Sequence, residues 1–258
     1  MNRELNAYEV NKVKTCARAK LGEYRKINDI MGYQIFSILQ ICARVIYYPL
    51  GKDAPWGFTR LTGSQNNVQH EKPFVAINTS IPSDCQVFAA AHELYHIWYG
   101  KNSGNDEKLA SRFAAEFLVD EVLLRQELDL RSTGEITIKS ILQLCEIFAV
   151  PYRTMVRRLN ETGMISEQKM AELLAISEKD IECFRRRYSF VMPKADERVV
   201  MDNLPELAAT AYEKGLITFE KLEYLLGLSN LTPEDIAIDK APEYEFPTDD
   251  EIDSIMEE

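Results

Sequence analysis

The chain has 258 residues, 46% hydrophobic and 28% charged, which is enough to bury a core and is typical of a globular protein. The formal net charge is -11, and the last sixteen residues hold eight acidic side chains and no basic ones. Without them the charge is -3, so the body of the chain has no overall basic excess that would suit it to duplex DNA.

Composition also favours a cytoplasmic location. No N-terminal stretch has the pattern of a secretory signal, and no run approaches eighteen consecutive apolar residues. The five cysteines are odd in number, widely spaced and never in a C-x-x-C pair, which is typical of reduced thiols. They are Cys16, Cys42, Cys85, Cys145 and Cys183.

The first part of the chain predicts helices followed by a sheet. From about residue 4 to 44 apolar residues recur at helical spacing, and we expect two amphipathic helices rather than one. Runs typical of strands follow at 45–48, 58–61 and 74–78, separated by Gly, Pro, Asn and Gln. We interpret them as a small antiparallel sheet.

A helical segment then contains the most informative motif. Ser83 is a possible N-cap, helix-forming residues continue to Tyr99, and Gly100 offers a stop. Within it lies AAAHELYHIWYG, residues 89–100, with the pattern H-E-x-x-H. His92 and His96 stand on one helical face, so their imidazoles can bind one metal ion.

This spacing points to zinc chemistry. Two histidines are two of the three protein ligands of a catalytic zinc, whose last position is left for water. Glu93 lies about 100° around the helix from His92, beside the ion but angled toward that water. Zinc lowers the pKa of such a water to about 7, and Glu93 can take its proton and pass it to a leaving amine. The motif therefore predicts amide hydrolysis with Glu93 as general base.

The third ligand is sought in the next helix, expected from about residue 106 to 119. Glu107, Ala110, Ser111 and Ala114 share one face there, and the small residues let this helix approach the alanines of the first. We therefore expect Glu107 to complete a Zn²⁺ site with His92 and His96. Asp106 is its nearest rival, His70 a weaker one, and Glu116 lies too far along the helix.

The remaining chain reads as short helices at about 137–150, 152–160, 167–174 and 178–187, then a helical pair at 204–217 and 219–228. No repeat longer than a helical hairpin is visible. We expect a metallopeptidase core with N-terminal helices at 1–132, a helix-turn-helix-like region at 133–190, a helical segment at 191–242 and a disordered acidic tail at 243–258. The fold class is α+β, with a zincin-like sheet and helix pair followed by all-helical C-terminal parts.

These motifs resemble the ImmA/IrrE family of zinc metallopeptidases. In that family a strand ending in Asn precedes the H-E-x-x-H helix, and a helix of the form E-x-x-A-N-x-F-A-A-x-L-L-M-P follows it. This sequence has Ala76-Ile77-Asn78, then the motif, then a helix that begins at Glu107 and has Phe113-Ala114-Ala115. It departs from the pattern at three positions. Tyr95 stands where the family has Gly, Ser111 where it has Asn or Asp, and Asp120 where it has Pro.

The resemblance implies zinc ligands His92, His96 and Glu107 and the general base Glu93. It also implies an endopeptidase that cleaves a regulatory protein, such as a DNA-binding repressor or an antitoxin, and so controls genes of mobile elements or stress responses. The strand expected at 74–78 could hold an extended substrate segment as an edge strand. Tyr95, Tyr99 and His70 are unranked candidates for stabilising the oxyanion.

Two other functions stay open. Residues 136–159 have the outline of a helix-turn-helix whose second helix carries Arg153, Arg157 and Arg158, which would suit DNA binding. The same apolar residues are also what simple helix packing needs. Alternatively, the chain could hold zinc without cleaving and act as a partner-binding regulator. Its acidic tail would then dock a basic partner or inhibit the protein itself.

Overall fold

The computed structural model describes residues 5–24, 26–61, 72–100, 106–131, 135–196, 198–201, 203–229 and 231–239. The chain forms two compact units, Met1–Asp202 and Asn203–Glu258, and each has a hydrophobic core of its own. Among the described helices, none combines the length and apolarity needed to span a membrane. His70 and the acidic tail at 243–258 lie outside the described residues.

The predicted α+β class is confirmed, but the sheet is mixed rather than antiparallel. The strands are β1 (Arg44–Tyr48), β2 (Gly57–Arg60), β3 (Phe74–Asn78) and β4 (Val200–Met201), in the order β2-β3-β1-β4. β3 runs antiparallel to β2 and parallel to β1, while β4 is antiparallel to β1. The predicted antiparallel pairing is wrong for β1 and β3, which are parallel neighbours. The strand between them in sequence, β2, pairs with the other side of β3 and does not lie between β1 and β3.

The expectation that residues 74–78 form an edge strand is also wrong. β3 lies between β2 and β1, and Val75, Ala76 and Ile77 are all buried, although neighbouring residues of a strand face opposite sides. A run that is apolar on both faces is typical of an interior strand. Among the described strands, β2 and β4 are the edges of the sheet.

The N-terminal segment forms two α-helices, as predicted. α1 (Ala7–Glu23) begins with a capping box, in which Asn6 Oδ1 accepts from the Glu9 backbone N–H at 2.9 Å and Glu9 accepts from the Asn6 backbone N–H at 2.8 Å. A 3₁₀ turn, η1 (Gly32–Gln34), leads into α2 (Ile35–Cys42), which packs against β1 and α3.

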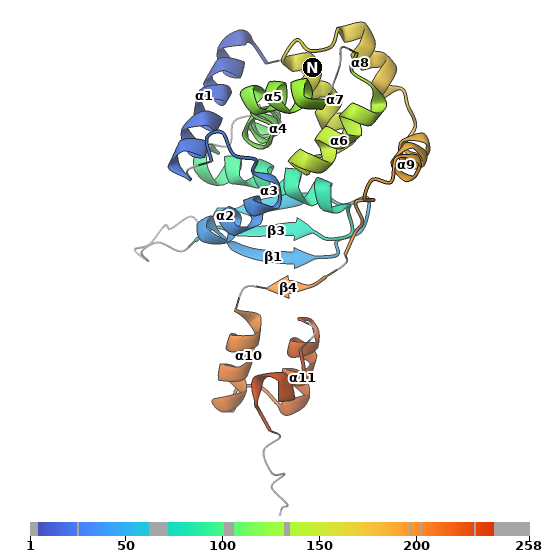
Figure 1. Cartoon of the computed structure of the whole chain (residues 1–258). Helices are drawn as coiled ribbons and strands as arrows, with labels where there is room; N and C mark the ends of the chain where they lie inside the picture. Colours follow the sequence, from blue (N-terminus) through green and yellow to red (C-terminus); the bar gives the residue numbers. More distant parts are fainter. Residues whose placement is uncertain are drawn as a thin grey trace, which may run out of the picture. The chain divides into compact units, whose positions relative to one another are not determined.

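The helix with the H-E-x-x-H motif is α3 (Ser83–Tyr99), and it lies between the sheet and the helices that follow (Figure 1). It ends before Gly100, as predicted. Ser83 is its first residue and not its N-cap, which is Pro82 and offers no side-chain hydrogen bond.

α4 (Asp106–Leu118) packs along α3 and α1. Small buried residues occur in both helices, namely Ala89, Ala90 and Ala91 in α3 and Ala110 and Ala114 in α4. α5 (Glu121–Arg131) follows at once because Asp120 Oδ1 accepts hydrogen bonds from the backbone N–H groups of Val122 at 2.9 Å and Leu123 at 3.3 Å. Asp120 thus starts a helix in place of the proline of the family pattern.

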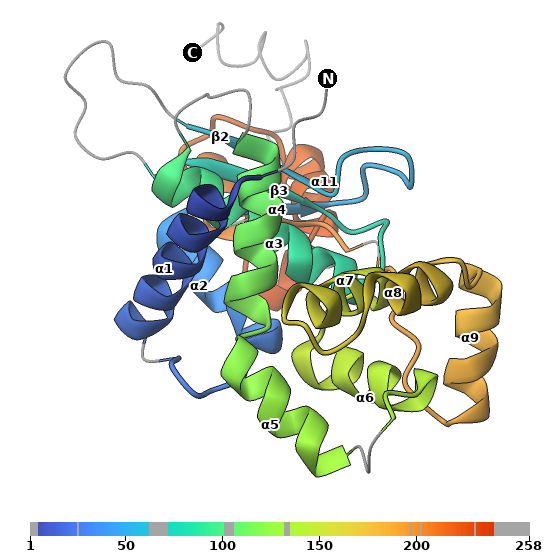
Figure 2. The ribbon, with the colours of Figure 1, turned by 90° about the horizontal axis from the view of Figure 1, so that it is seen from above.

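Four helices complete the helical part of the first unit: α6 (Ile138–Phe148), α7 (Tyr152–Glu161), α8 (Glu167–Leu174) and α9 (Glu178–Arg187). They gather beside α5 at one end of this unit (Figure 2). Their buried residues join one hydrophobic cluster with those of α1, α3 and the sheet. The predicted boundary between residues 132 and 133 stays a prediction.

The chain then returns to the sheet in extended form. The backbone N–H of Ser83 donates to Lys194 O at 3.2 Å, and Thr79 Oγ1 donates to Arg198 O at 2.9 Å, before β4 pairs with β1. The second unit contains α10 (Leu204–Glu213), α11 (Phe219–Gly227) and a 3₁₀ turn, η2 (Glu234–Ile236). α10 and α11 form the predicted helical pair around Ala208, Leu222 and Leu226.

Candidate metal centre

Three donor groups converge where α3 meets the start of α4. His92 Nε2 and His96 Nε2 are 3.2 Å apart because the two side chains lie one turn apart on the same face of α3. Glu107, in the first turn of α4, places Oε2 at 3.1 Å from His92 Nε2 and Oε1 at 3.4 Å from His96 Nε2. Among the described residues, this is the one group of histidine, cysteine and acidic side chains whose geometry suits a metal ion.

The donor set fits zinc in chemistry and in size. Zinc prefers four tetrahedral ligands with bonds of about 2.0–2.2 Å to nitrogen and oxygen, which separates neighbouring donors by about 3.4 Å. The two histidine nitrogens are 3.2 Å apart, and each lies 3.1 or 3.4 Å from a different carboxylate oxygen of Glu107, so the spacing of these side chains is of that order. Two imidazole nitrogens that face each other at 3.2 Å also need a proton or a cation between them. Two histidines, one carboxylate and an open fourth position match the catalytic type of zinc site.

Ser111 lies within hydrogen-bonding distance of the second ring nitrogen of His92. Its Oγ lies 3.3 Å from His92 Nδ1, on the ring side opposite the other donors. A histidine that binds a metal through Nε2 carries its proton on Nδ1 and donates it to such a partner. The serine at the family's Asn or Asp position therefore keeps a hydrogen-bonding group beside this ring.

Tyr95 lies beside the His96 ring, with ring centroids 5.9 Å apart, and in the contact between α3 and α4. It is buried, and its ring packs against Phe113 of α4 and Tyr99 of α3 with centroid distances of 5.6 and 5.7 Å. Burial raises the pKa of the Tyr95 hydroxyl, and the nearby Asp106 carboxylate adds to the shift. The bulky residue inside the motif thus fills the contact between α3 and α4.

Glu93 faces the sheet, one residue along α3 from His92. Its side chain is buried, with 4% relative exposure for the residue, and its Oε2 accepts a hydrogen bond of 2.7 Å from Thr59 Oγ1 of β2. Burial raises the pKa of this carboxyl to about 7, although the Thr59 hydrogen bond opposes the shift. Burial also lowers the pKa of the His92 ring, as does the neighbouring His96.

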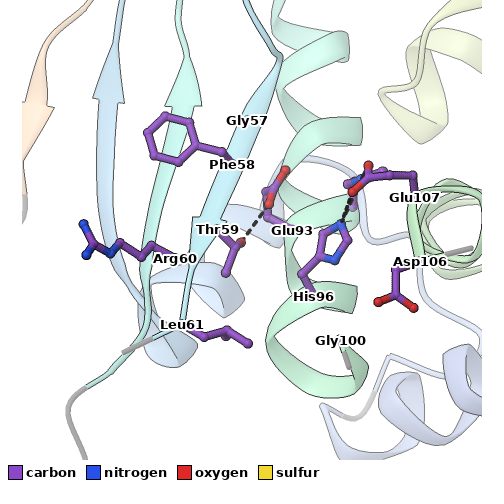
Figure 3. Close-up of a pocket in the computed structure, with 11 residues that line it drawn as sticks. Gly57, Phe58, Thr59, Arg60, Leu61, Glu93, His96, Gly100, Asp106 and Glu107 are labelled. Carbon is purple, nitrogen blue, oxygen red and sulfur yellow. Dashed lines mark hydrogen bonds and ion pairs between the residues drawn. The ribbon is translucent and has the colours of Figure 1, made fainter. Parts of the chain in front are cut away.

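These groups line an open cavity of about 720 Å³ between β2 and the helix pair (Figure 3). Its described lining consists of Gly57, Phe58, Thr59, Arg60, Leu61, His92, Glu93, His96, Gly100, Asp106 and Glu107. In Figure 3 Thr59 and Glu93 meet on the strand side of the cavity, and His96 and Glu107 meet on the helix side. A base and a metal-type donor set therefore face the same space.

The sequence predicts a strand close to β2, but it does not indicate that Gly57 and Thr59 of this strand belong to the site. A Cβ on Gly57 would lie 3.1 Å from both Glu93 Oε1 and the Ala76 carbonyl oxygen, so the glycine leaves room for the glutamate. The loop before β2 is held by Asn78, whose Nδ2 donates to Gly51 O at 2.8 Å and Pro55 O at 3.2 Å. Asn78 is recognisable in the sequence as the last residue of its strand. No local pattern, however, links it to β2, about twenty residues earlier.

The other candidates are not brought to the donor group. Asp106 lines the cavity but is not one of the three converging ligands. Tyr95 and Tyr99 do not belong to the described lining of the cavity, and His70 lies outside the described residues. None of these three residues is therefore supported as the oxyanion stabiliser.

The predicted helix-turn-helix outline is present in the structure, but much of its second helix is packed against the rest of the first unit. α6 and α7 have nearly the predicted limits, with Ala149 at the turn in the left-handed conformation. Met155 and Leu159 of α7 are buried, and so is Arg158, at 1% exposure. The Arg158 guanidinium donates to Glu116 Oε2 at 2.5 Å and to Val119 O at 2.9 Å, which ties α7 to α4.

Comparison with known proteins agrees with the peptidase resemblance of the motifs. Residues 44–160 match a family model for a peptidase domain described as the IrrE N-terminal-like domain. The match spans β1 to α7 and so includes all three donor groups and Glu93. No curated protein and no solved structure gives a significant match to the chain. Residues 44–160, a little under half of the chain, are thus similar to the ImmA/IrrE family of peptidases, the family that the motifs resemble.

Proposed function

We propose that the chain is a zinc-dependent endopeptidase whose ligands are His92, His96 and Glu107 and whose general base is Glu93. The observation that carries this proposal is the pair of features around one cavity: three side chains whose ligand atoms lie within 4.8 Å of one another, and a buried carboxyl group that lines the same cavity. Its substrate is a regulatory protein, such as a DNA-binding repressor or an antitoxin. Five free cysteines are consistent with the cytoplasmic location that we also propose.

The residues divide the work of peptide hydrolysis. Zinc held by the three donors would act as a Lewis acid on the scissile carbonyl and would acidify water to a pKa of about 7. Glu93 accepts the proton of the attacking water and then donates it to the amide nitrogen as the carbon–nitrogen bond breaks. Thr59 fixes the Glu93 carboxylate, and Ser111 fixes the His92 ring.

The substrate backbone lies along β2. This strand borders the cavity, and only one of its sides pairs with another described strand. An unpaired strand edge binds an extended peptide through main-chain hydrogen bonds, so the edge could place a scissile bond between Glu93 and the metal ligands. A substrate must then offer an extended or locally unfolded segment, which excludes cleavage inside a packed helix.

DNA binding is less well supported as an alternative. Of the three arginines of α7, Arg158 is buried, and Arg153 lies 4.0 Å from Glu178 and donates to Leu174 O at 3.4 Å. A gel-shift with random duplex at low salt should therefore show no retardation. A shift that falls steeply with salt would favour the DNA-binding alternative.

The experiment that tests the proposal is incubation of the purified chain with the repressor or antitoxin proteins encoded beside its gene. Wild type with zinc should cleave one of them, and Glu93→Gln should bind zinc equally but not cleave. Cleavage that survives Glu93→Gln would overturn the mechanism. A partner that binds wild type and Glu93→Gln alike without being cut would favour the non-cleaving regulator. Deletion of 243–258 then tests whether the acidic tail controls activity or partner affinity.

A further inference from the structure

Two helical hairpins of the chain share a sequence pattern at an offset of 52 residues. Residues 163–177 read GMISEQKMAELLAIS, and residues 215–229 read GLITFEKLEYLLGLS. Six of the fifteen positions are identical, and four more exchange Met for Leu, Ser for Thr or Ile for Leu. The first stretch follows α7 and contains α8, and the second follows α10 and contains α11.

The two hairpins also have the same backbone. Gly163 and Gly215 each turn the chain in the left-handed region, with φ of 71° and 67°. The next residues close matching bonds, Met164 N–H to Leu159 O and Leu216 N–H to Ala211 O, both at 2.8 Å. Ser166 and Thr218 cap the second helix of each pair. The α10–α11 hairpin therefore repeats the local backbone of the α7–α8 hairpin.

The two hairpins differ in what covers one face. In the first hairpin, Met155 of α7 is fully buried, and Met164 packs against the peptidase core. Their counterparts are Leu207, which is 63% exposed, and Leu216, which is 72% exposed. Ala211 lies one turn after Leu207, and its backbone carbonyl accepts from the Leu216 N–H at 2.8 Å, so the three residues are neighbours near the end of α10. We call Leu207, Ala211 and Leu216 the open face.

Charge indicates what kind of partner the open face fits. Residues 203–258 carry fifteen acidic and three basic side chains, whereas residues 1–202 carry twenty-six acidic and twenty-seven basic ones. In the first unit α7 packs against another helix, α6, and Met155, the counterpart of Leu207, is buried. A helix that packs on this strongly acidic unit should carry basic residues beside its apolar stripe, where they meet the acidic side chains.

We propose that the open face of α10 and α11 is a docking surface for a basic amphipathic helix of a partner protein. The helix would pack its apolar stripe on Leu207 and Leu216, and its lysines and arginines would face the acidic side chains of the unit. This binding needs neither the metal site nor the cavity. It therefore stands independently of the proposed peptidase chemistry.

The test uses the full chain and a labelled helical peptide of about 18 residues, with leucines at helical spacing and lysines elsewhere. Fluorescence anisotropy should show binding by wild type. Leu207→Ser with Leu216→Ser should weaken it at least about tenfold, because two apolar contacts are lost. Tyr224→Ser is the matched control. Tyr224 is 59% exposed but aligns with Glu172, which is exposed in the first hairpin, so affinity should stay within about twofold.

Several results would overturn the proposal. One is no binding by wild type. Another is equal binding of a scrambled peptide of the same composition, since charge alone would then explain the affinity. Equal affinity of the double variant would show that the peptide binds elsewhere. If sedimentation shows a wild-type dimer that the double variant abolishes, the open face belongs to a second copy of the chain. Circular dichroism confirms that each variant is folded.

Discussion

At the scale of single residues, Ser111 connects the two helices of the metal centre. Its hydroxyl oxygen is 3.3 Å from His92 Nδ1, the nitrogen that must keep its proton if Nε2 binds zinc. Ser111→Ala removes this acceptor without touching a ligand, so we expect zinc affinity to fall about tenfold. Ser111→Asn, which restores the residue of the family pattern, should keep the affinity of wild type.

The measurement is competition for zinc against a fluorescent chelator. Thr15→Ala is a suitable control, since it removes an exposed hydroxyl from α1 that bonds only to the Asn11 carbonyl oxygen among the described contacts. Equal zinc affinity for Ser111→Ala and wild type would show that the contact with His92 does not orient the ring.

Gly57 tests the position of the general base. An alanine Cβ there would lie 3.1 Å from Glu93 Oε1 and from the Ala76 carbonyl oxygen, so the glutamate has to shift. Because small displacements of a catalytic group are costly, Gly57→Ala should lower the rate of substrate cleavage by about tenfold or more while zinc content is unchanged.

Gly227→Ala is the matched control for this change. A Cβ on Gly227 meets nothing within 4 Å, so both cleavage and zinc content should stay at the level of wild type. An unchanged cleavage rate in Gly57→Ala would show that Glu93 is not held where β2 places it, or that it is not the base.

At the scale of elements, a buried ion pair joins α4, which carries Glu107, to α7. Arg158 and Glu116 are almost completely buried, and Arg112 also contacts Glu116 at 2.6 Å. Removing one partner leaves an uncompensated buried charge, which typically costs about 3–5 kcal/mol. Since Arg112 still pairs with Glu116, Arg158→Met should lower the free energy of unfolding by about 3 kcal/mol, at the low end of that range.

Urea unfolding followed by tryptophan fluorescence measures this cost in the first unit alone, because Trp56 and Trp98 are the two tryptophans of the chain. Arg157→Met, on the exposed side of the same helix, should change stability by no more than about 0.5 kcal/mol. A similar small effect for Arg158→Met would contradict a structural role for the buried pair.

The elements also show what the sequence can predict. The helical periodicity and Gly100 were sufficient to predict α3. The alanines of both helices were sufficient to predict that α3 contacts α4, since these signals are local. The parallel pairing of β1 and β3 was not predictable in this way, because pairing depends on the path of the chain between strands. The two-residue strand β4 was missed because Val200–Met201 is too short to show alternation.

The same division applies to the metal centre. His92, His96 and Glu93 follow from one motif, and Glu107 follows from helix spacing. Thr59 and Gly57 lie more than thirty residues before Glu93 and meet it only because β2 joins the outer side of β3. A contact set by sheet topology leaves no mark in a local sequence pattern.

At the scale of the whole molecule, the chain divides its charge. The first unit is nearly neutral and contains the cavity, while the residues from 203 onward carry the net negative charge of the chain. In the proposed function the first unit cleaves the substrate, and the acidic second unit offers a separate surface for recognising it. Recognition outside the cavity would then supplement the limited sequence preference of a single edge strand.

In the proposed mechanism, His92, His96 and Glu107 hold a zinc ion that serves Glu93. Metal analysis of the purified full chain decides whether they do. We expect about one zinc per chain in wild type and in Glu93→Gln, and little or none in His92→Ala or Glu107→Ala. A wild-type chain that retains no zinc when supplied with it, or a His92→Ala chain that retains as much as wild type, would contradict the account.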